Sequence, residues 1–187
     1  MLSEPFEAQL TSRLEIRCVT ADDAAATSLL MTPGVGRWLA SWPIPFTPEM
    51  AGARIDALRQ LAFRGDALPF AITSRTDGAL LGWATILRNE GDRRSASLGF
   101  WLGERHQAKG YMREIAPIVT DAGFKLLAVD VIEAGAQLAN TGSFAVMKAC
   151  GMTLVGTRTI HASARGRDEL CRFYEIRRAQ SLSGWSS

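Results

Sequence analysis

A turn of six residues between an apolar strand and a helix is the part of this sequence best suited to chemistry. It reads Gln107-Ala108-Lys109-Gly110-Tyr111-Met112 and follows the apolar run 98–102. At such a turn the first N–H groups of the helix lack backbone partners, and the helix dipole adds partial positive charge. Lys109 places a mobile cation beside them. The turn therefore predicts a pyrophosphate site, with an ordinary structural turn as the alternative.

The elements around this turn predict a single α+β domain with the order β-α-α-β-β-β-α-β-α-β-β. Apolar or alternating runs predict about seven strands, at 13–19, 68–74, 80–88, 94–102, 129–134, 153–161 and 169–178. Helices are expected at 21–31, 47–64, 110–127 and 141–150, and Thr32-Pro33-Gly34 should end the first of them. Residues 1–12 are expected to form a loose leader, 13–178 the domain, and 179–187 a tail.

The order of these elements also predicts where a ligand would bind. Three meandering strands followed by a strand–helix–strand crossover give a mixed, mostly antiparallel sheet with helices on both faces. The crossover should set strand 94–102 parallel to strand 129–134 and beside it. A ligand site belongs at the carboxyl ends of these strands, where the turn at 107–112 also lies.

The aromatic, proline-rich connection from Trp38 to Phe46 is too apolar for a solvated linker. We expect it mainly to pack over the sheet, with lining a pocket as a second role.

Composition excludes several classes of protein. With 187 residues, 47% hydrophobic and 21% charged, the chain is typical of an ordinary globular domain. A net charge of +2 gives no reason to expect nucleic acid or a membrane surface, and the N-terminus lacks the pattern of a signal peptide. The three cysteines, Cys18, Cys150 and Cys171, are far apart and predict reduced thiols in or near the core. We therefore expect no metal and a cytoplasmic location.

Together, the element order and two motifs resemble the GNAT superfamily of acetyl-CoA-dependent N-acetyltransferases. The cofactor signature of that family is Gln/Arg-x-x-Gly-x-Gly/Ala, which here becomes Gln107-x-x-Gly110-x-Met112. The wider run 98–115 is similar to the Rim-type branch, which acetylates ribosomal-protein N-termini such as those beginning with alanine. So is 140–152, which follows the Asn-x-x-Ser-x-x-x-x-Lys-x-x-Gly pattern of that branch. The resemblance covers residues 13–178.

The resemblance implies that acetyl-CoA is the co-substrate and that it lies in a groove along the strand before the turn. The backbone of Trp101 and Leu102 should pair with the pantetheine arm, and a backbone N–H there could polarise the thioester carbonyl. The turn should hold the pyrophosphate, and the Asn140 amide should contact the pantetheine arm or cap the helix. The expected cofactor-binding residues are Phe100, Trp101, Leu102, Gln107, Ala108, Lys109, Gly110, Tyr111, Met112, Asn140 and Ser143.

Two residues depart from the family pattern. Met112 stands where a Gly or Ala is usual, close to the cofactor phosphates, so we expect altered or weaker binding unless its side chain turns into the core. Met147 stands where many members carry a tyrosine that is proposed to protonate the leaving thiolate. These departures keep open an alternative function, a catalytically silent acyl-CoA-binding or sensing module.

Three residues are expected to be catalytic in the acetyl transfer. Resemblance and its place on the first turn of a helix make Ser143 a donor to the thiolate, with a backbone-bonded serine as the alternative. Glu133 and Glu104 are candidate bases, although an α-amine, with a pKa of about 7.7–8.0, needs little help. His161 could flank the acceptor amine or simply lie on the surface.

The expected reaction is direct transfer to a primary amine, without an acyl-enzyme, because no cysteine or serine has a nucleophile–base setting. The acceptor could be a protein N-terminus or a small amine. The sequence does not decide the oligomeric state, and a homodimer stays open.

Overall fold

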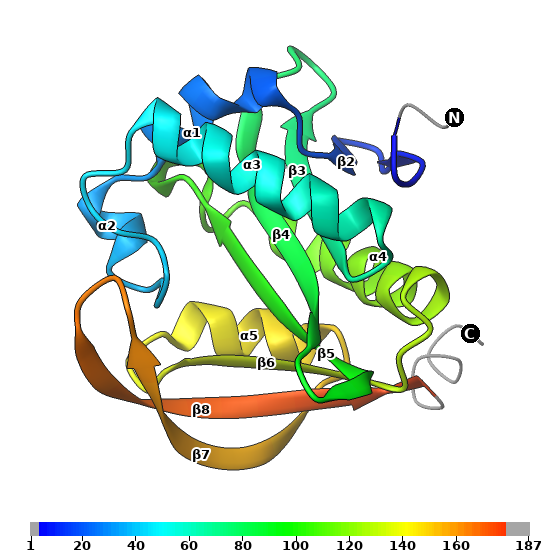
Figure 1. The fold of residues 1–187 in the computed structure, drawn as a ribbon, viewed down its shortest axis with the longest axis vertical. Coiled ribbons are helices and arrows are strands. Elements are labelled where there is room, and N and C mark those ends of the chain that lie inside the picture. The colour runs from blue at the N-terminus through cyan, green and yellow to red at the C-terminus, as the bar shows by residue number, and fades with distance from the viewer. Residues whose placement is uncertain (1–3, 179–187) are drawn as a thin grey trace.

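A mixed sheet of eight strands runs through the middle of the molecule, in the order β1-β2-β3-β4-β5-β6-β8-β7 (Figure 1). The computed structural model describes residues 4–178. The strands are β1 (Gln9–Leu10), β2 (Leu14–Cys18), β3 (Ala67–Ser74), β4 (Leu80–Asn89), β5 (Asp92–Leu102), β6 (Val131–Gln137), β7 (Thr153–Ala162) and β8 (Arg167–Arg177). The helices are α1 (Ala24–Leu30), α2 (Pro33–Gly36), α3 (Pro48–Phe63), α4 (Tyr111–Leu126) and α5 (Thr141–Ala149), with 3-10 turns η1 (Ala21–Asp23) and η2 (Glu104–His106).

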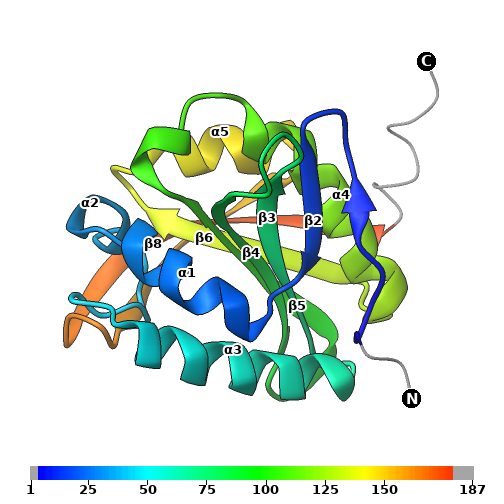
Figure 2. The same cartoon turned by 90° about the horizontal axis from the view of Figure 1, so that it is seen from above.

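Helices cover both faces of the sheet, with α1 and α3 on one side and α4 and α5 on the other (Figure 2). All strand pairings are antiparallel except that of β5 with β6. This confirms the expected α+β class and the predicted parallel neighbours on either side of the crossover helix α4.

The β5–β6 pairing is short, and the two strands then separate. Only residues 95–97 of β5 lie in register with residues 131–133 of β6. Beyond Ser97, β5 continues to Leu102 beside β4, while β6 continues beside β8. The carboxyl halves of β5 and β6 therefore diverge, as Figure 1 shows, and leave the edge of β5 without a strand partner there.

Residues before the expected first strand also join the sheet, which explains eight strands instead of about seven. Gln9 lies opposite Ile16 in an antiparallel pair, and the Phe6 ring packs on Phe70 with centroids 4.8 Å apart. Part of the expected loose leader is therefore attached to the domain. The expected tail at 179–187 lies outside the described residues.

The expected helix over 21–31 is divided into two short elements and followed by a third. The 3-10 turn η1 precedes α1, which ends at Leu30. Pro33 then begins α2 instead of only ending a helix, because the Thr32 hydroxyl accepts a hydrogen bond from the Val35 N–H and caps it. The same capping pattern, Thr47-Pro48, begins α3, where the Thr47 hydroxyl accepts from the Met50 N–H and confirms the helix expected over 47–64.

Strand β6 begins and ends later than predicted, running to Gln137 instead of 134. Gly135 directly follows the predicted end of this strand, and a glycine inside a strand usually weakens it. In the structure the Phe173 ring on β8 lies directly over Gly135, at a position where an added Cβ would meet the ring at 2.3 Å. The glycine therefore makes room for a cross-strand aromatic ring.

Each face of the sheet has its own hydrophobic core. One core lies under α4 and α5 and includes Met112 and Met147. The other lies under α1 and α3 and includes Trp42, Trp83 and Trp101. Trp42 packs edge-on against both other indoles, with centroids 5.4 and 5.3 Å away, which confirms the expected packing role of the connection after α2.

The three cysteines are free and buried, as predicted. Burial raises the pKa of both Cys18 and Cys150 to about 11, so these thiols are protonated at neutral pH.

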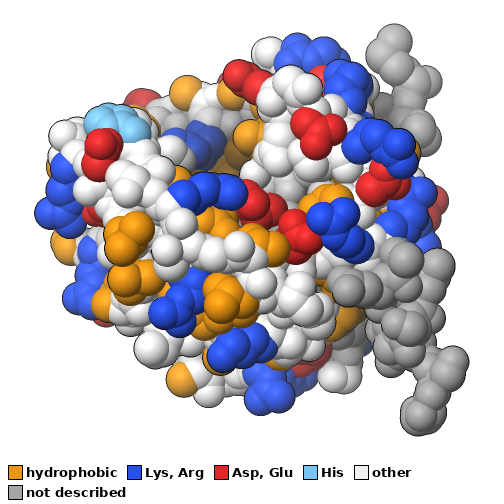
Figure 3. Space-filling view, turned by 90° about the horizontal axis from the view of Figure 1, so that it is seen from below, with side chains coloured by type: hydrophobic (Ala, Val, Ile, Leu, Met, Phe, Trp, Pro, Cys, Tyr) orange, Lys and Arg blue, Asp and Glu red, His pale blue; other side chains and the backbone are white. Residues whose placement is uncertain are grey.

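Among residues 4–178, no helix is long and apolar enough to cross a membrane. On the face shown in Figure 3, hydrophobic side chains lie among Lys and Arg side chains.

Candidate active site

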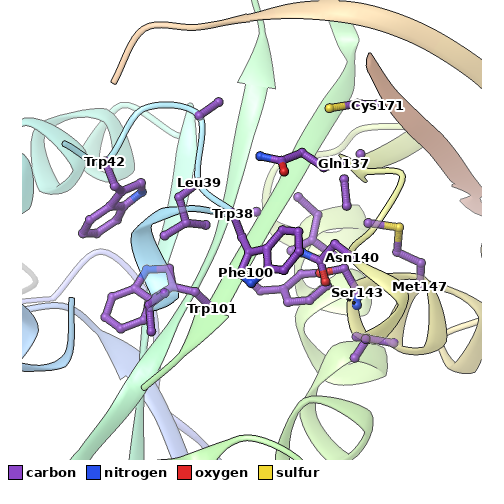
Figure 4. A pocket seen from close by; sticks show the side chains of 18 of the residues that line it. Trp38, Leu39, Trp42, Phe100, Trp101, Gln137, Asn140, Ser143, Met147 and Cys171 are labelled. Carbon is purple, nitrogen blue, oxygen red and sulfur yellow. Dashed lines mark hydrogen bonds between the residues drawn. The ribbon is translucent and has the colours of Figure 1, made fainter. Parts of the chain in front are cut away.

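A pocket opens where β5 and β6 diverge, at the place predicted for a ligand. Its volume is about 360 Å³. β5 contributes residues 98–102, β6 residues 135–137, α5 residues including Ser143 and Met147, and the connection after α2 residues 38–42. In Figure 4, Trp42 and Trp101 lie on one side of the pocket, and Asn140, Ser143 and Met147 lie on the other. The connection thus also has its expected second role.

The free edge of β5 presents backbone groups to this pocket. The Gly103 N–H donates to the Leu81 carbonyl on β4 at 2.9 Å, and the Arg94 carbonyl accepts from Asp130 on the opposite side at 2.7 Å. Because backbone groups alternate along a strand, Phe100 and Leu102 direct theirs away from β4. Of the two residues whose backbone the sequence favoured, Leu102 lies with its backbone groups on this free edge, and Trp101 directs its groups towards β4.

Within residues 4–178, the turn after β5 leaves several backbone N–H groups without a backbone partner. Ala108 and Gly110 both have left-handed backbones, with φ of 59° and 78°. Among the described residues, no carbonyl accepts from the N–H groups of Ala108, Lys109 or Gly110. Together with the first turn of α4, which Gly110 begins, they leave a run of backbone N–H groups unpaired in the described chain, an arrangement that can bind an anion.

Within this turn, only some side chains reach the pocket. Gln107 and Met112 line it, and the Gln107 amide donates to the Leu102 carbonyl at 2.9 Å. Ala108, Lys109 and Gly110 are exposed beside it. The side chain of Met112 is 7% exposed and packs in the core under α4, so its length is turned away from the turn surface.

Arg13, which immediately precedes β2, supports the turn, and no pattern in the sequence indicates this contact. Its Nη1 donates to the Lys109 carbonyl at 3.1 Å, and its Nε donates to Glu114 at 2.7 Å. The guanidinium also lies 4.7 Å from the centroid of the Tyr111 ring. Arg13 therefore connects the turn to the first turn of α4 and to the sheet.

The start of α5 brings Asn140 and Ser143 to the pocket. The Asn140 Oδ1 accepts from the Ser143 N–H at 3.2 Å, which confirms the expected capping role. Within residues 4–178, the Asn140 Nδ2 and the Ser143 hydroxyl have no hydrogen-bond partner. Both groups line the pocket and are available to a ligand.

The candidate bases and His161 lie elsewhere. Glu133 forms an ion pair with Arg158, and Glu104 accepts from the Thr32 hydroxyl; neither carboxylate lines the pocket. His161 is exposed, with Nδ1 2.8 Å from an Asp168 oxygen, as its surface alternative predicted. The structure thus brings Ser143 to the pocket but not Glu133 or Glu104.

The pocket contains one carboxylate that the sequence did not single out, Glu169 on β8. Arg165 binds both its oxygens, at 2.9 and 2.7 Å, and Arg167 binds Oε1 at 2.9 Å. Gln137 donates to Oε2 at 2.8 Å. The Arg165 hydrogen bonds, more than those of Arg167, lower the pKa of Glu169 to about 2, so it is ionised and a weak base. The spacing Arg165-x-Arg167-x-Glu169 was its signal in the sequence.

Trp101 adds a buried donor at the pocket. Its indole is 7% exposed, and within the described part of the chain Nε1 has no hydrogen-bond partner. In residues 4–178, no group of three or more His, Cys, Asp and Glu side chains is placed to hold a metal ion. The Trp101 N–H, unpartnered among the described residues, is a donor that suits a ligand carbonyl group.

Comparison with known sequences identifies the family. Residues 13–153 match the model of the acetyltransferase (GNAT) domain. An uncharacterized N-acetyltransferase of Bacillus licheniformis, p20, is 26% identical over 165 residues, which cover 87% of this chain and 91% of p20.

Solved structures agree with this assignment. RimJ of Mycobacterium smegmatis, in complex with CoA-disulfide, is 25% identical with a TM-score of 0.78, covering 89% of this chain and 82% of RimJ. The ribosomal-protein-S5-alanine acetyltransferase of Vibrio fischeri shares the fold, with 21% identity, a TM-score of 0.78, and coverage of 97% of this chain and 100% of that protein. The structural neighbours thus include Rim-type ribosomal-protein acetyltransferases. The chain belongs to the acetyltransferase (GNAT) family, the N-acetyltransferases that use acetyl-CoA.

Proposed function

We propose that this protein transfers the acetyl group of acetyl-CoA directly to the primary amine of a protein N-terminus or of a small molecule. The observation that carries the proposal is the pocket itself. It runs from the turn residues Gln107 and Met112, along the free edge of β5, to the connection at 38–42. A donor with a pyrophosphate at one end and a thioester at the other fits such a path.

The chain offers a partner for each part of acetyl-CoA. The unpaired N–H groups of the turn and of the first turn of α4 would bind the pyrophosphate. The backbone of Phe100 and Leu102, with the Asn140 Nδ2, would bind the amide groups of the pantetheine arm. Since Met112 points into the core, the main sequence argument for weak binding loses its force.

Acetyl transfer requires that the amine and the thioester be held close together and that the thioester carbonyl be polarised. The neutral amine attacks the thioester carbon, the C–N bond forms, and the C–S bond breaks to release a thiolate. A β5 backbone N–H would stabilise the oxyanion, and the Ser143 hydroxyl would donate a proton to the thiolate near the N-terminus of α5. The proton lost by the amine passes to solvent, and solvent returns a proton to the Ser143 oxygen.

The acceptor class follows from charge. Glu169 is the one acidic side chain among the described lining residues, and two arginines already neutralise it. A polyamine or aminoglycoside would bring several positive charges to a site without a free carboxylate. A single α-amine, which is partly neutral near pH 8, suits the pocket better.

Base roles for Glu133 and Glu104 stay predictions. Each carboxylate already has a partner, Arg158 and Thr32 respectively. Either one would have to release that partner and reach the acceptor through water. With an α-amine, water alone suffices as the proton acceptor.

Release of free thiol from acetyl-CoA tests the proposal with a panel of amines: alanine- and serine-initiated peptides, free lysine and spermidine. Titration of acetyl-CoA alone runs in parallel. We expect binding, and turnover greatest with the peptides. Binding without turnover on any amine would instead support the silent acyl-CoA-binding module, and absence of binding would contradict both functions.

A further inference from the structure

One wall of the pocket is a short stretch of chain whose backbone carbonyls accept hydrogen bonds from other parts of the molecule. We call residues 36–40 the wall segment. Trp38, Leu39 and Ala40 from this segment line the pocket. It follows α2 and has no strand partner of its own. Apart from local turn hydrogen bonds, such as that from the Leu39 N–H to the Gly36 carbonyl at 3.0 Å, its position depends on side chains and on the hairpin that joins β7 to β8.

The hairpin makes most of these contacts, and Arg165 makes the central ones. Arg165 Nη1 donates to the carbonyls of Gly36 and Leu39 at 3.1 and 3.0 Å. The Ala164 N–H donates to the Ala40 carbonyl at 2.9 Å. From β6, Gln137 Nε2 donates to the Arg37 carbonyl at 3.0 Å. Four carbonyls of the wall segment are thus bound by β6 and the hairpin.

Glu169 orients both side chains that hold the wall segment. Its two oxygens receive the remaining nitrogens of Arg165, and Oε2 also receives Gln137 Nε2. The Glu169 side chain is 8% exposed and that of Arg165 is 20% exposed, so this pair is little screened by water. A planar guanidinium can bind a carboxylate with one edge and carbonyls with the other, which an ammonium cannot do.

From this geometry we infer that Arg165 and Glu169 are positioning residues that fix the acceptor end of the pocket by holding the wall segment in place. The inference rests on the proposed function, because it assigns the wall segment to the acceptor. The turn at 107–112, on which acetyl-CoA binding is proposed, makes none of these contacts. Loss of the Arg165–Glu169 pair should therefore affect the acceptor and spare the donor.

The experiment compares Arg165→Ala with Arg165→Lys and Arg167→Ala. Arg167→Ala is the matched control, because Arg167 also binds Glu169 but is 66% exposed and has no contact with the wall segment among the described residues. The measurements are the KM for the best amine of the panel, the Kd of acetyl-CoA, and amide hydrogen exchange of peptides spanning 36–42.

For Arg165→Ala we expect a roughly tenfold rise in acceptor KM, a Kd of acetyl-CoA within about twofold of wild type, and faster exchange at 36–42. In Arg165→Lys, the rise in acceptor KM and the faster exchange should both be smaller. In Arg167→Ala, the acceptor KM and the exchange should be those of wild type. Unchanged exchange and unchanged acceptor KM in Arg165→Ala would overturn the inference, as would an equal loss of acetyl-CoA affinity.

Failure of the proposed function is recognised separately. It would appear in the wild-type protein, as acetyl-CoA binding without turnover on any amine. Amide hydrogen exchange still decides the inference in that case. If peptides spanning 36–42 exchange as slowly in Arg165→Ala as in wild type, Arg165 does not hold the wall segment.

Discussion

Two buried tryptophans differ in one hydrogen bond, and this difference indicates which of them serves a ligand. Trp83 and Trp101 stack with centroids 6.4 Å apart. Trp83 Nε1 donates to the buried Thr27 hydroxyl at 3.0 Å. Trp101 Nε1 is buried at the pocket and, in the part of the chain that the structure describes, has no partner. A buried donor without a partner costs roughly 1–3 kcal/mol, which a ligand carbonyl would recover.

Substitution by phenylalanine separates the two roles. Both changes remove the same ring atoms, so they share the cost of a cavity. Trp83→Phe also leaves the Thr27 hydroxyl unpaired and should lower the free energy of unfolding more than Trp101→Phe does, by roughly 1 kcal/mol. Urea denaturation measures this difference. Trp101→Phe should instead weaken binding of a pocket ligand about fivefold, measured as the acetyl-CoA Kd or the acceptor KM, and equal stability losses with no binding change would contradict the argument.

Ser143 is the residue whose chemistry is most directly testable. If its hydroxyl protonates the thiolate, Ser143→Ala should lower kcat about tenfold while leaving the Kd of acetyl-CoA and the acceptor KM nearly unchanged. The loss is modest because a thiolate is already a fair leaving group. Thr141→Ala is the control, since Thr141 begins the same helix but does not line the pocket. Steady-state kinetics that show a KM effect alone would assign Ser143 to binding.

At the scale of elements, the turn before α4 depends on a left-handed glycine beside the expected phosphates. Gly110→Asp should reduce acetyl-CoA affinity at least tenfold, because the new carboxylate would repel the pyrophosphate across a few ångströms. Gly65→Asp is the matched control. Gly65 also has a positive φ, of 74° compared with 78°, and it lies after α3, outside the pocket lining.

Isothermal titration measures both variants of this pair. Similar stability losses are expected, because both positions strain a residue with a Cβ. Equal acetyl-CoA affinities in the two variants would show that the phosphates bind elsewhere.

Elements with local signals were predictable from the sequence, and those that depend on partners were not. Thr47-Pro48 and Gly110 mark helix starts by themselves, and both are confirmed. The extension of β6 past Gly135 depends on the Phe173 ring from another strand. Helix α2 was missed because Thr32-Pro33 fits both the end of one helix and the start of the next.

The same distinction applies to the candidate site. Asn140, Ser143 and the 107–112 turn belong to motifs that are contiguous in the chain. Arg13 reaches Lys109 across 96 residues, and Arg165 reaches Gly36 across 129. Hydrogen bonds from side chains to backbone carbonyls over such separations leave no periodic pattern in one sequence. Conversely, Glu133 and Glu104 looked available for catalysis because their partners, Arg158 and Thr32, are also distant.

At the scale of the whole molecule, Arg165 joins the β7–β8 hairpin to the wall segment and is held by Glu169, so titration of Glu169 should influence stability. The arginine hydrogen bonds lower the pKa of Glu169 from 4.5 to about 2 in the folded protein. A lowered folded pKa means that the carboxylate stabilises the fold fully above about pH 4.5. That contribution is lost as the pH falls from there through about 2.

Glu169→Gln removes this titration while keeping the size of the side chain. The free energy of unfolding of wild type should exceed that of the variant by its largest margin near pH 7, and the margin should shrink between pH 4.5 and 2. Among the groups that face Glu169, its hydrogen bonds raise the pKa of Arg165, and burial raises the pKa of Cys171, so neither of these groups titrates in this range. Denaturant unfolding at several pH values measures the margin. If the difference in free energy of unfolding between wild type and Glu169→Gln is independent of pH, the Glu169 carboxylate is no more stabilised in the folded chain than in the unfolded one. The arginines would then hold the hairpin without it.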